Sequence, residues 1–314
     1  MKKTVGLLLA ISLMLNGWLV WERNGKFNAD AQDTERADAD RFAFLSKRIF
    51  TQNQNDVLIN FVPLRLALRE YVGRFDGNAG VYFEYLPSGV SVGVNDQMEV
   101  RLASLIKVPI VMAVYKQIEG GSMVENQTLT VSSEDLSAGF GDLWKRGTGV
   151  QVTLMEAVRM SLVDSDNTAA RILRVALPDG EVEKVFDSLD IFVNQLGQVP
   201  FVTPKGYSSI LRSLYLSSYL ARESSNEILE LLTRTKFSDL LPAGVDDKVK
   251  VAHKIGVFES DGVWSDCGIV YVPDRPYILC VMSRASKNEA GDIIREVSRM
   301  VYAYVSQIEG GSRR

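Results

Sequence analysis

The segments of this chain that favour β-strands lie near both ends of its folded region, and the residues between them favour helices. Residues 80–95 show the alternating apolar pattern and the turn residues of a hairpin. Three more β-rich runs follow near the C-terminus, at 249–257, 264–272 and 276–283. Apolar residues at helical spacing predict helices at 62–74, 104–118, 153–163, 167–176, 207–221, 225–233 and 289–307.

This order predicts an α+β fold. Strands at the two ends are expected to form one antiparallel sheet covered by the terminal helices, with an inserted all-α domain. The predicted divisions are a tether and leading helix over 23–59, a folded domain over 60–308 (α/β part 60–103 plus 245–308, all-α part 104–244), and a loose tail over 309–314.

The N-terminal segment predicts export from the cytoplasm. Lys2 and Lys3 precede an uncharged, mostly apolar run from Thr4 to Trp21. As a helix this run is about 27 Å long, close to the roughly 30 Å hydrocarbon core of a bilayer. Residues 1–22 are therefore expected to anchor the chain in the cell membrane as a single pass, with the folded domain on the extracytoplasmic side. A cleaved signal peptide is the alternative reading.

The composition excludes several classes of function. The net charge of −4 does not suit nucleic-acid binding, which needs a basic face. A single histidine and two cysteines cannot build the common zinc or iron–sulfur centres, so we expect no metal and no cofactor. Cys267 and Cys280 fall on adjacent predicted strands, offset from direct opposition by roughly two residues, which favours free thiols over a disulfide.

The first motif with chemical potential is Ser104-Leu-Ile-Lys107, at the start of an apolar predicted helix. Residues three apart lie on one helix face, so the lysine can reach the serine hydroxyl. A lysine with a lowered pKa can remove the hydroxyl proton and make the serine a nucleophile. Taken alone, the pattern is frequent by chance, and a surface serine and lysine on an ordinary helix is the favoured interpretation.

The second motif, Ser165-Asp166-Asn167, lies between two predicted helices. Its hydroxyl could relay a proton to a leaving group, and its amide could hold a substrate carbonyl. Taken alone, the motif favours a helix N-cap, for which all three residues are suitable.

The third motif, Lys254-Ile255-Gly256, lies on a predicted strand. A cation beside a glycine lets a substrate approach the strand and pairs with its negative group. A solvated lysine before a bulge glycine is the alternative. His253 invites a serine-triad interpretation, but strand packing is favoured because Lys107 already supplies a base.

In this order the three motifs resemble those of the class A β-lactamases and the wider penicillin-recognising serine hydrolases. The resemblance covers about residues 60–308 and implies the β-lactamase/transpeptidase fold. It implies that Ser104 is the acylated nucleophile, Lys107 its activating partner and Ser165 part of the proton network. It also implies an oxyanion hole made by the backbone N–H groups of Ser104 and Val257, and it assigns substrate binding to Asn167, Lys254, Gly256 and Val257.

Two departures from the family pattern affect the expected chemistry. Class A enzymes carry a glutamate on an Ω-loop that drives water into the acyl-enzyme, but residues 190–204 contain none. Asp187 and Asp190 are the nearest carboxylates, and Glu183 lies further back. Ile255 also replaces a threonine or serine whose hydroxyl binds the substrate carboxylate.

The sequence thus favours a membrane-anchored serine acyl hydrolase that opens a β-lactam or related cell-wall amide through a Ser104 acyl-enzyme, with slow deacylation. Its expected partners are a β-lactam or a peptidoglycan-derived small molecule, and the membrane. A peptidoglycan D,D-peptidase-like enzyme and a non-hydrolytic envelope protein that binds muropeptides or a partner remain alternatives.

Overall fold

The structure is a computed structural model that describes residues 44, 60–196 and 199–307. The predicted anchor over 1–22, the tail over 309–314 and nearly all of the 23–59 tether lie outside these residues. Within the described part of the chain, no helix is both long and apolar enough to span a bilayer.

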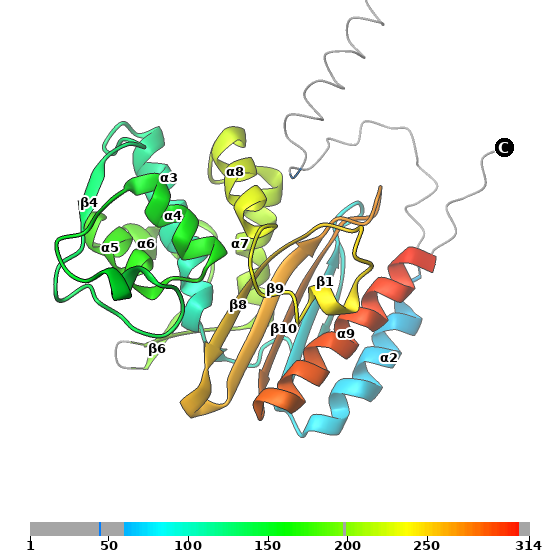
Figure 1. Cartoon of the computed structure of the whole chain (residues 1–314). Helices are drawn as coiled ribbons and strands as arrows, with labels where there is room; N and C mark the ends of the chain where they lie inside the picture. The colour runs from blue at the N-terminus through cyan, green and yellow to red at the C-terminus, as the bar shows by residue number, and fades with distance from the viewer. Residues whose placement is uncertain (1–43, 45–59, 197–198, 308–314) are drawn as a thin grey trace, which may run out of the picture. The chain divides into compact units, whose positions relative to one another are not determined.

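One antiparallel sheet joins the two ends of the folded region, as the sequence predicted. Its strand order is β2-β1-β10-β9-β8. The N-terminal hairpin therefore pairs with the C-terminal strands through β1 and β10, and β8 forms an edge of the sheet (Figure 1). The strands are β1 (Ala79–Tyr85), β2 (Val90–Val94), β8 (Val251–Phe258), β9 (Val263–Val270) and β10 (Tyr277–Arg284).

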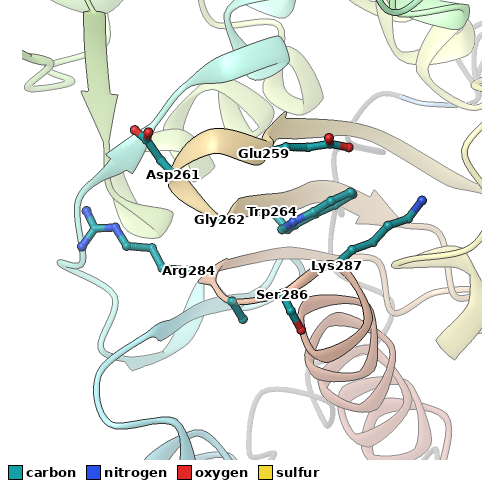
Figure 2. A pocket seen from close by; sticks show the side chains of 8 residues that line it. Glu259, Asp261, Gly262, Trp264, Arg284, Ser286 and Lys287 are labelled. Atoms are coloured by element: carbon teal, nitrogen blue, oxygen red, sulfur yellow. The ribbon is translucent and has the colours of Figure 1, made fainter.

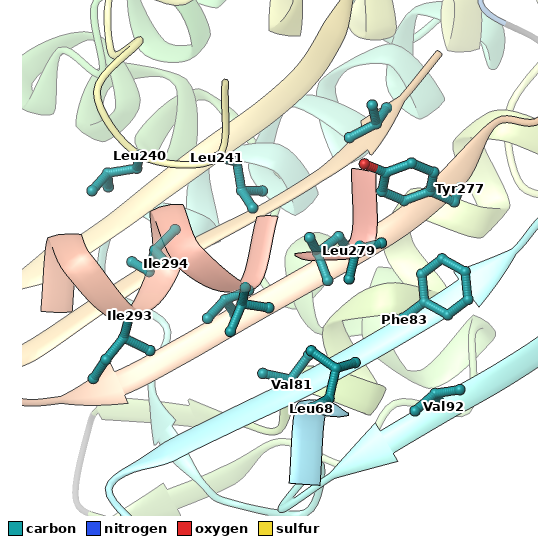
Figure 3. Packing of buried hydrophobic residues seen from close by; sticks show 14 of the residues in the cluster. Leu68, Val81, Phe83, Val92, Leu240, Leu241, Tyr277, Leu279, Ile293 and Ile294 are labelled. Atoms are coloured by element: carbon teal, nitrogen blue, oxygen red, sulfur yellow. The ribbon is translucent and has the colours of Figure 1, made fainter. Parts of the chain in front are cut away.

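Two terminal helices cover one face of this sheet. Helix α2 (Val62–Val72) begins at a proline-containing first turn and buries Leu64, Leu68 and Val72, which are spaced by four residues. Helix α9 (Lys287–Gln307) runs beside it (Figure 1). Figure 3 shows Leu68 on α2, Ile293 and Ile294 on α9, and strand residues such as Val81 and Phe83 meeting in one apolar cluster. Burying each such side chain contributes about 1.5–3 kcal/mol.

Helix α7 (Pro204–Leu216) packs against the other face of the sheet, where it contacts β1, β9 and β10. The remaining helices form the predicted helical block: α3 (Lys107–Glu119), α4 (Leu154–Val163), α5 (Asn167–Ala176), α6 (Glu181–Ser188) and α8 (Arg222–Leu232). Short strands pair within this region, β4 (Thr128–Thr130) with β5 (Gln151–Thr153), and β7 (Val199–Val202) with both β3 (Val100–Arg101) and β6 (Asn194–Leu196). Single 3₁₀ turns are η2 (Gly73–Phe75), η3 (Ala103–Ile106), η4 (Leu143–Arg146), η5 (Pro242–Gly244) and η6 (Glu259–Asp261).

Two local expectations were wrong. The predicted helix over 104–118 is divided into the 3₁₀ turn η3 and the α-helix α3, and Ala103 opens the turn with a positive φ of 45°. Cys267 and Cys280 are directly opposed on β9 and β10, without the predicted offset. The short connection after the pair Val270↔Tyr277 sets this register, and the connection length is hard to read from the apolar pattern alone.

Candidate active site

Ser104 lies on the short 3₁₀ turn η3, between β3 and the helix α3. A hydrogen bond from α7 stabilises this turn: the buried Tyr207 hydroxyl donates to the Leu105 carbonyl at 3.1 Å. The first N–H groups of a helical turn have no partner within the turn, so the Ser104 N–H is available to a ligand. The residue before the serine, Ala103, has a left-handed backbone conformation, which is sparsely populated for residues with a side chain and concentrates at functional sites.

Lys107, the first residue of α3, is the centre of a buried hydrogen-bond network. Its Nζ lies within hydrogen-bond distance of four oxygens: Ser104 Oγ at 3.0 Å, Asn167 Oδ1 at 2.7 Å, and the hydroxyl and carbonyl oxygens of Ser165 at 3.1 and 2.5 Å. Burial lowers the pKa of Lys107 to about 7, and the nearby Asp166 carboxylate opposes that shift. A neutral amine in contact with a serine hydroxyl can act as its general base.

The Ser165-Asp166-Asn167 segment combines the two interpretations that its sequence allowed. Asp166 caps α5, since its Oδ1 accepts from the Ala169 N–H at 2.8 Å. The cap fixes the residues on either side, so Ser165 and Asn167 both face Lys107. Ser165 has a positive φ of 54°, a second strained position in this site. A Cβ on Gly141 would lie 2.1 Å from the Asp166 carboxylate, so only glycine lets the preceding loop pack this closely.

Lys254 reaches the same hydroxyl from the sheet. Its Nζ donates to Ser165 Oγ at 2.8 Å, so Ser165 bridges the two lysines. The side chain is fully buried, which rules out the solvated-lysine interpretation. Burial lowers the pKa of Lys254 well below its usual value, the neighbouring Lys107 lowers it further, and Asp266 opposes the shift. Two amines so close together cannot both remain protonated without a large cost.

The edge strand β8 presents a backbone N–H to the site. The Tyr271 N–H donates to the Lys250 carbonyl at 2.9 Å, immediately before β8. Hydrogen bonding alternates along an antiparallel pair, and the β8–β9 register is continuous. The even-numbered residues of β8 therefore bond to β9, and the backbone groups of Val257 point out of the sheet at its free edge. This orientation suits an oxyanion donor.

Gly256 allows β8 to pack against the nucleophile turn. A Cβ at this position would lie 2.8 Å from Leu105 Cγ and 3.0 Å from the Leu102 carbonyl oxygen. The glycine was expected to admit a substrate, and the structure shows that it also admits η3. Close packing here keeps the Val257 N–H and the Ser104 turn next to each other.

The opposite face of β8 carries Ile255 and His253. Ile255 is buried in the apolar cluster under α2 and α9, so this position supplies packing where the family has a hydroxyl. His253 is also buried, and its Nδ1 lies 2.8 and 3.0 Å from the two carboxylate oxygens of Asp266. Asp266 also accepts from the Leu241 N–H at 3.0 Å. His253 therefore has the strand-packing role expected for it.

The described residues of the 190–204 segment form the β6–β7 pair, and Ile191, Phe192, Val193 and Pro200 line a cavity of about 640 Å³. The cavity lining includes Glu183, Asp187 and Ile106. In the sequence, Ile106 lies between Ser104 and Lys107. Glu183 forms an ion pair with Arg174 at 3.1 Å. Of the carboxylates considered from the sequence, Glu183 and Asp187 thus line the cavity beside the nucleophile turn.

Sequence reasoning missed an aromatic pair beside Lys254. Phe140 and Phe237 pack edge to face with their centroids 5.4 Å apart, and Lys254 Nζ lies 5.7 Å from the Phe237 ring. Phe140 is flanked by Gly139 and Gly141, both with positive φ. The Gly139-Phe140-Gly141 pattern could have predicted this residue from the sequence, since two glycines around an aromatic residue indicate a tight loop that presents its side chain.

A second hollow, of about 520 Å³, lies away from these motifs. Figure 2 shows Glu259 and Asp261 from the β8–β9 turn, Arg284 at the end of β10 and Lys287 at the start of α9 around this hollow, with Trp264 between them. Several of its charges already have partners, because Asp261 forms a 2.6 Å ion pair with Arg101 and Lys287 lies over the Trp264 ring. None of the three motifs contributes to its lining.

Comparisons with known proteins agree with the fold and with the family resemblance. A sequence model of the beta-lactamase enzyme family matches residues 63–305. β-Lactamase CARB-3 of Pseudomonas aeruginosa is 24% identical over 288 residues, which cover 84% of this chain and 94% of that protein. The solved structure of PBP-A superposes with a TM-score of 0.72 at 26% identity, covering 79% of this chain and 97% of that one. The acyl-enzyme complex of a PBP-A mutant with penicillin G also superposes with a TM-score of 0.72, at 25% identity over 78% of this chain and 97% of that one.

The class defined by this fold and these matches is that of the penicillin-recognising serine hydrolases. The chain belongs to the beta-lactamase enzyme family and is a serine β-lactamase-like hydrolase that acts on amide bonds.

Proposed function

We propose that this protein opens the amide bond of a β-lactam, or of a related cell-wall amide, through an acyl-enzyme on Ser104. The observation that carries the proposal is the 3.0 Å contact between Ser104 Oγ and the buried Lys107 amine, whose pKa is about 7. The penicillin G acyl-enzyme of the PBP-A mutant supports it, because that protein has the same fold and accepts such an acyl group.

The acylation step uses each member of the network. Neutral Lys107 takes the Ser104 proton as Oγ bonds to the amide carbon. The resulting oxyanion is stabilised by the N–H groups of Ser104 and Val257, and one such donor is worth about 10²–10³ in rate. The C–N bond then breaks, and the departing nitrogen receives the Ser165 hydroxyl proton. Lys107, which carries the proton taken from Ser104 and contacts Ser165 Oγ at 3.1 Å, restores that proton and becomes neutral again, while Lys254 orients the Ser165 hydroxyl.

Release of the acyl group is proposed to be slow. Deacylation needs a water and a positioned base, which contributes about 10²–10⁴-fold, and residues 190–204 carry no glutamate. Asp187 is the first residue to test as a substitute base, because it lines the cavity next to Ile106. Ile255 also lacks the hydroxyl that contacts the substrate carboxylate in the family, so carboxylate recognition is expected to depend on Lys254.

A D,D-peptidase-like activity is the second candidate, because the missing glutamate favours it. An enzyme that acylates readily and hydrolyses slowly would behave as a penicillin-binding protein toward β-lactams. A non-hydrolytic envelope protein that binds muropeptides would need the same cleft but would form no covalent adduct.

Intact mass spectrometry after incubation with penicillin G distinguishes these functions. We expect one adduct on the wild-type protein and none on Ser104→Ala, which removes a single oxygen and leaves the packing unchanged. A chase without drug then measures release. A persistent adduct supports slow deacylation, whereas rapid turnover with no adduct would make Asp187→Asn and Asp190→Asn the next variants. Equal labelling of Ser104→Ala would refute the assigned nucleophile.

The N-terminal run is proposed to hold this activity at the outer side of the cell membrane. The support is the uncharged Thr4–Trp21 segment, which is long enough to span the bilayer. The protein should then fractionate with membranes and be released by detergent but not by high salt. Recovery of a soluble mature chain that begins near Gln32 would favour a cleaved signal peptide.

A further inference from the structure

Cys267 and Cys280 form a directly opposed pair at the centre of the sheet. They pair in register on β9 and β10, and both are fully buried. The neighbouring Cys280 thiol raises the pKa of Cys267, after burial as the main cause. They are free thiols in this structure.

The backbone places these residues at the type of position where a cross-strand disulfide fits. The Lys250–Tyr271 bond sets the alternation along β9, so Cys267 directs its backbone groups to β8. Cys267↔Cys280 is therefore a non-hydrogen-bonded pair, in which the Cα atoms are typically about 4.5 Å apart and the side chains lie closest. Disulfides span Cα separations of about 4.4–6.8 Å.

The cysteine pair also lies next to the proposed catalytic residues in the sheet. Cys267 is opposite Lys254 on β8, so the two side chains share a face of the sheet. Tyr207, whose hydroxyl holds the nucleophile turn at Leu105, is close enough to both thiols that they would raise its pKa electrostatically if ionised, after burial as the main cause. A covalent link here would fix β9 and β10 under the site.

We propose that Cys267 and Cys280 form a cross-strand disulfide when the chain folds in the presence of a disulfide oxidant, and that the folded thiol form cannot be converted to it. The Cys267 thiolate attacks one sulfur of the oxidant's disulfide and releases a thiolate. Cys280, after losing its proton, attacks Cys267 Sγ in the mixed disulfide and releases the second thiolate. The oxidant is thereby reduced to two thiols, and the protein loses two hydrogens.

The timing follows from burial. Neither thiol is exposed in the folded protein, and burial raises the pKa of Cys267 well above its usual value, which removes the reactive thiolate. The two strands are neighbours in sequence, so they can meet early, before α7 covers them. Oxidation must therefore precede the final packing of the sheet.

The test is to refold the denatured, reduced protein with oxidised and reduced glutathione, then denature it and alkylate free thiols with N-ethylmaleimide. We expect no N-ethylmaleimide adduct and a mass two hydrogens below that of the reduced protein. After a reductant is added, we expect two N-ethylmaleimide adducts. Folded, reduced protein given the same glutathione mixture should keep two alkylatable thiols. The single variants Cys267→Ala and Cys280→Ala are controls in which the mass change should be lost.

Stability and acylation give two further readouts. The disulfide form should unfold at a temperature higher by about 5–10 °C than the thiol form. Two free thiols in the refolded wild-type protein would overturn the proposal, and so would ready oxidation of the folded thiol form. Labelling of Ser104 by penicillin G is measured on both forms, so a failure of the disulfide is separate from a failure of the proposed catalysis. If the alanine variants do not fold, the wild-type alkylation alone decides.

Discussion

The two faces of β8 bury ionisable side chains in different ways. On the core face, His253 is matched with the carboxylate of Asp266, which also accepts a backbone N–H. On the cleft face, the hydrogen-bond partners found for Lys107 and Lys254 in the described part of the chain are hydroxyl, amide and carbonyl oxygens. A matched pair can keep its charge when buried, whereas an amine without a carboxylate partner loses its proton more easily. The first arrangement supports the fold, and the second yields a base at neutral pH.

The largest effect is expected at the cleft face. Lys107→Ala should slow acylation of Ser104 by about 10²–10⁴-fold, because the hydroxyl loses the group that accepts its proton. The measurement is the rate of adduct formation with a penicillin, followed by mass. Lys116→Ala, on an exposed part of the same helix, is the matched control and should acylate at the wild-type rate. An unchanged rate in Lys107→Ala would remove the lysine from the mechanism.

A substitution on the core face is expected to lower the free energy of unfolding more than the rate of acylation. His253→Ala leaves the Asp266 carboxylate buried with a single backbone donor, and breaking one partner of a buried pair costs about 3–5 kcal/mol. Chemical denaturation measures this loss. His253→Asn keeps a side-chain donor and should recover part of it. A His253→Ala protein with the wild-type unfolding free energy would show that the pair contributes nothing to the fold.

Lys254→Met tests the same comparison with the opposite sign. Replacing a buried amine with an apolar side chain of similar length should leave the unfolding free energy unchanged or raise it by about 1–4 kcal/mol. Acylation should nevertheless fall, because Ser165 loses one of its two amine donors. If Lys254→Met lowered the unfolding free energy as much as His253→Ala does, Lys254 would stabilise the fold, and its burial would not be a destabilising requirement of catalysis.

The local part of this site was predictable from sequence, and the long-range part was not. The Ser104–Lys107 contact follows from helical spacing and forms even though η3 interrupts the helix. The cap at Asp166 was likewise readable from residue type. The meeting of Ser165 with Lys254 depends on how the sheet edge packs against the helical block, and only the family resemblance pointed to it.

The remaining differences arise from tertiary packing. The prediction missed α6, although Val182, Val185 and Phe186 recur at helical spacing, and it missed the short strands β6 and β7, which are too brief to show a period. The burial of Ile255 under α9 could not be told from its sequence neighbours. The direct opposition of Cys267 and Cys280 depends on one connection length, which a shift of one residue would change.

The smallest effect expected is a pH dependence caused by Lys107. Its pKa is about 7 in the folded protein and 10.5 as a free side chain, so between these values the unfolded chain binds more protons. Stability must then rise with pH in this window, by up to about 2 kcal/mol between pH 7 and 9. Acylation should rise in parallel with a midpoint near pH 7, because only the neutral amine accepts the Ser104 proton. Denaturation and labelling are therefore followed together, with Lys107→Met as the reference whose stability curve lacks this contribution. A difference between the two proteins that stays constant from pH 7 to 9 would mean that Lys107 keeps its proton throughout, and another group would then have to be the base.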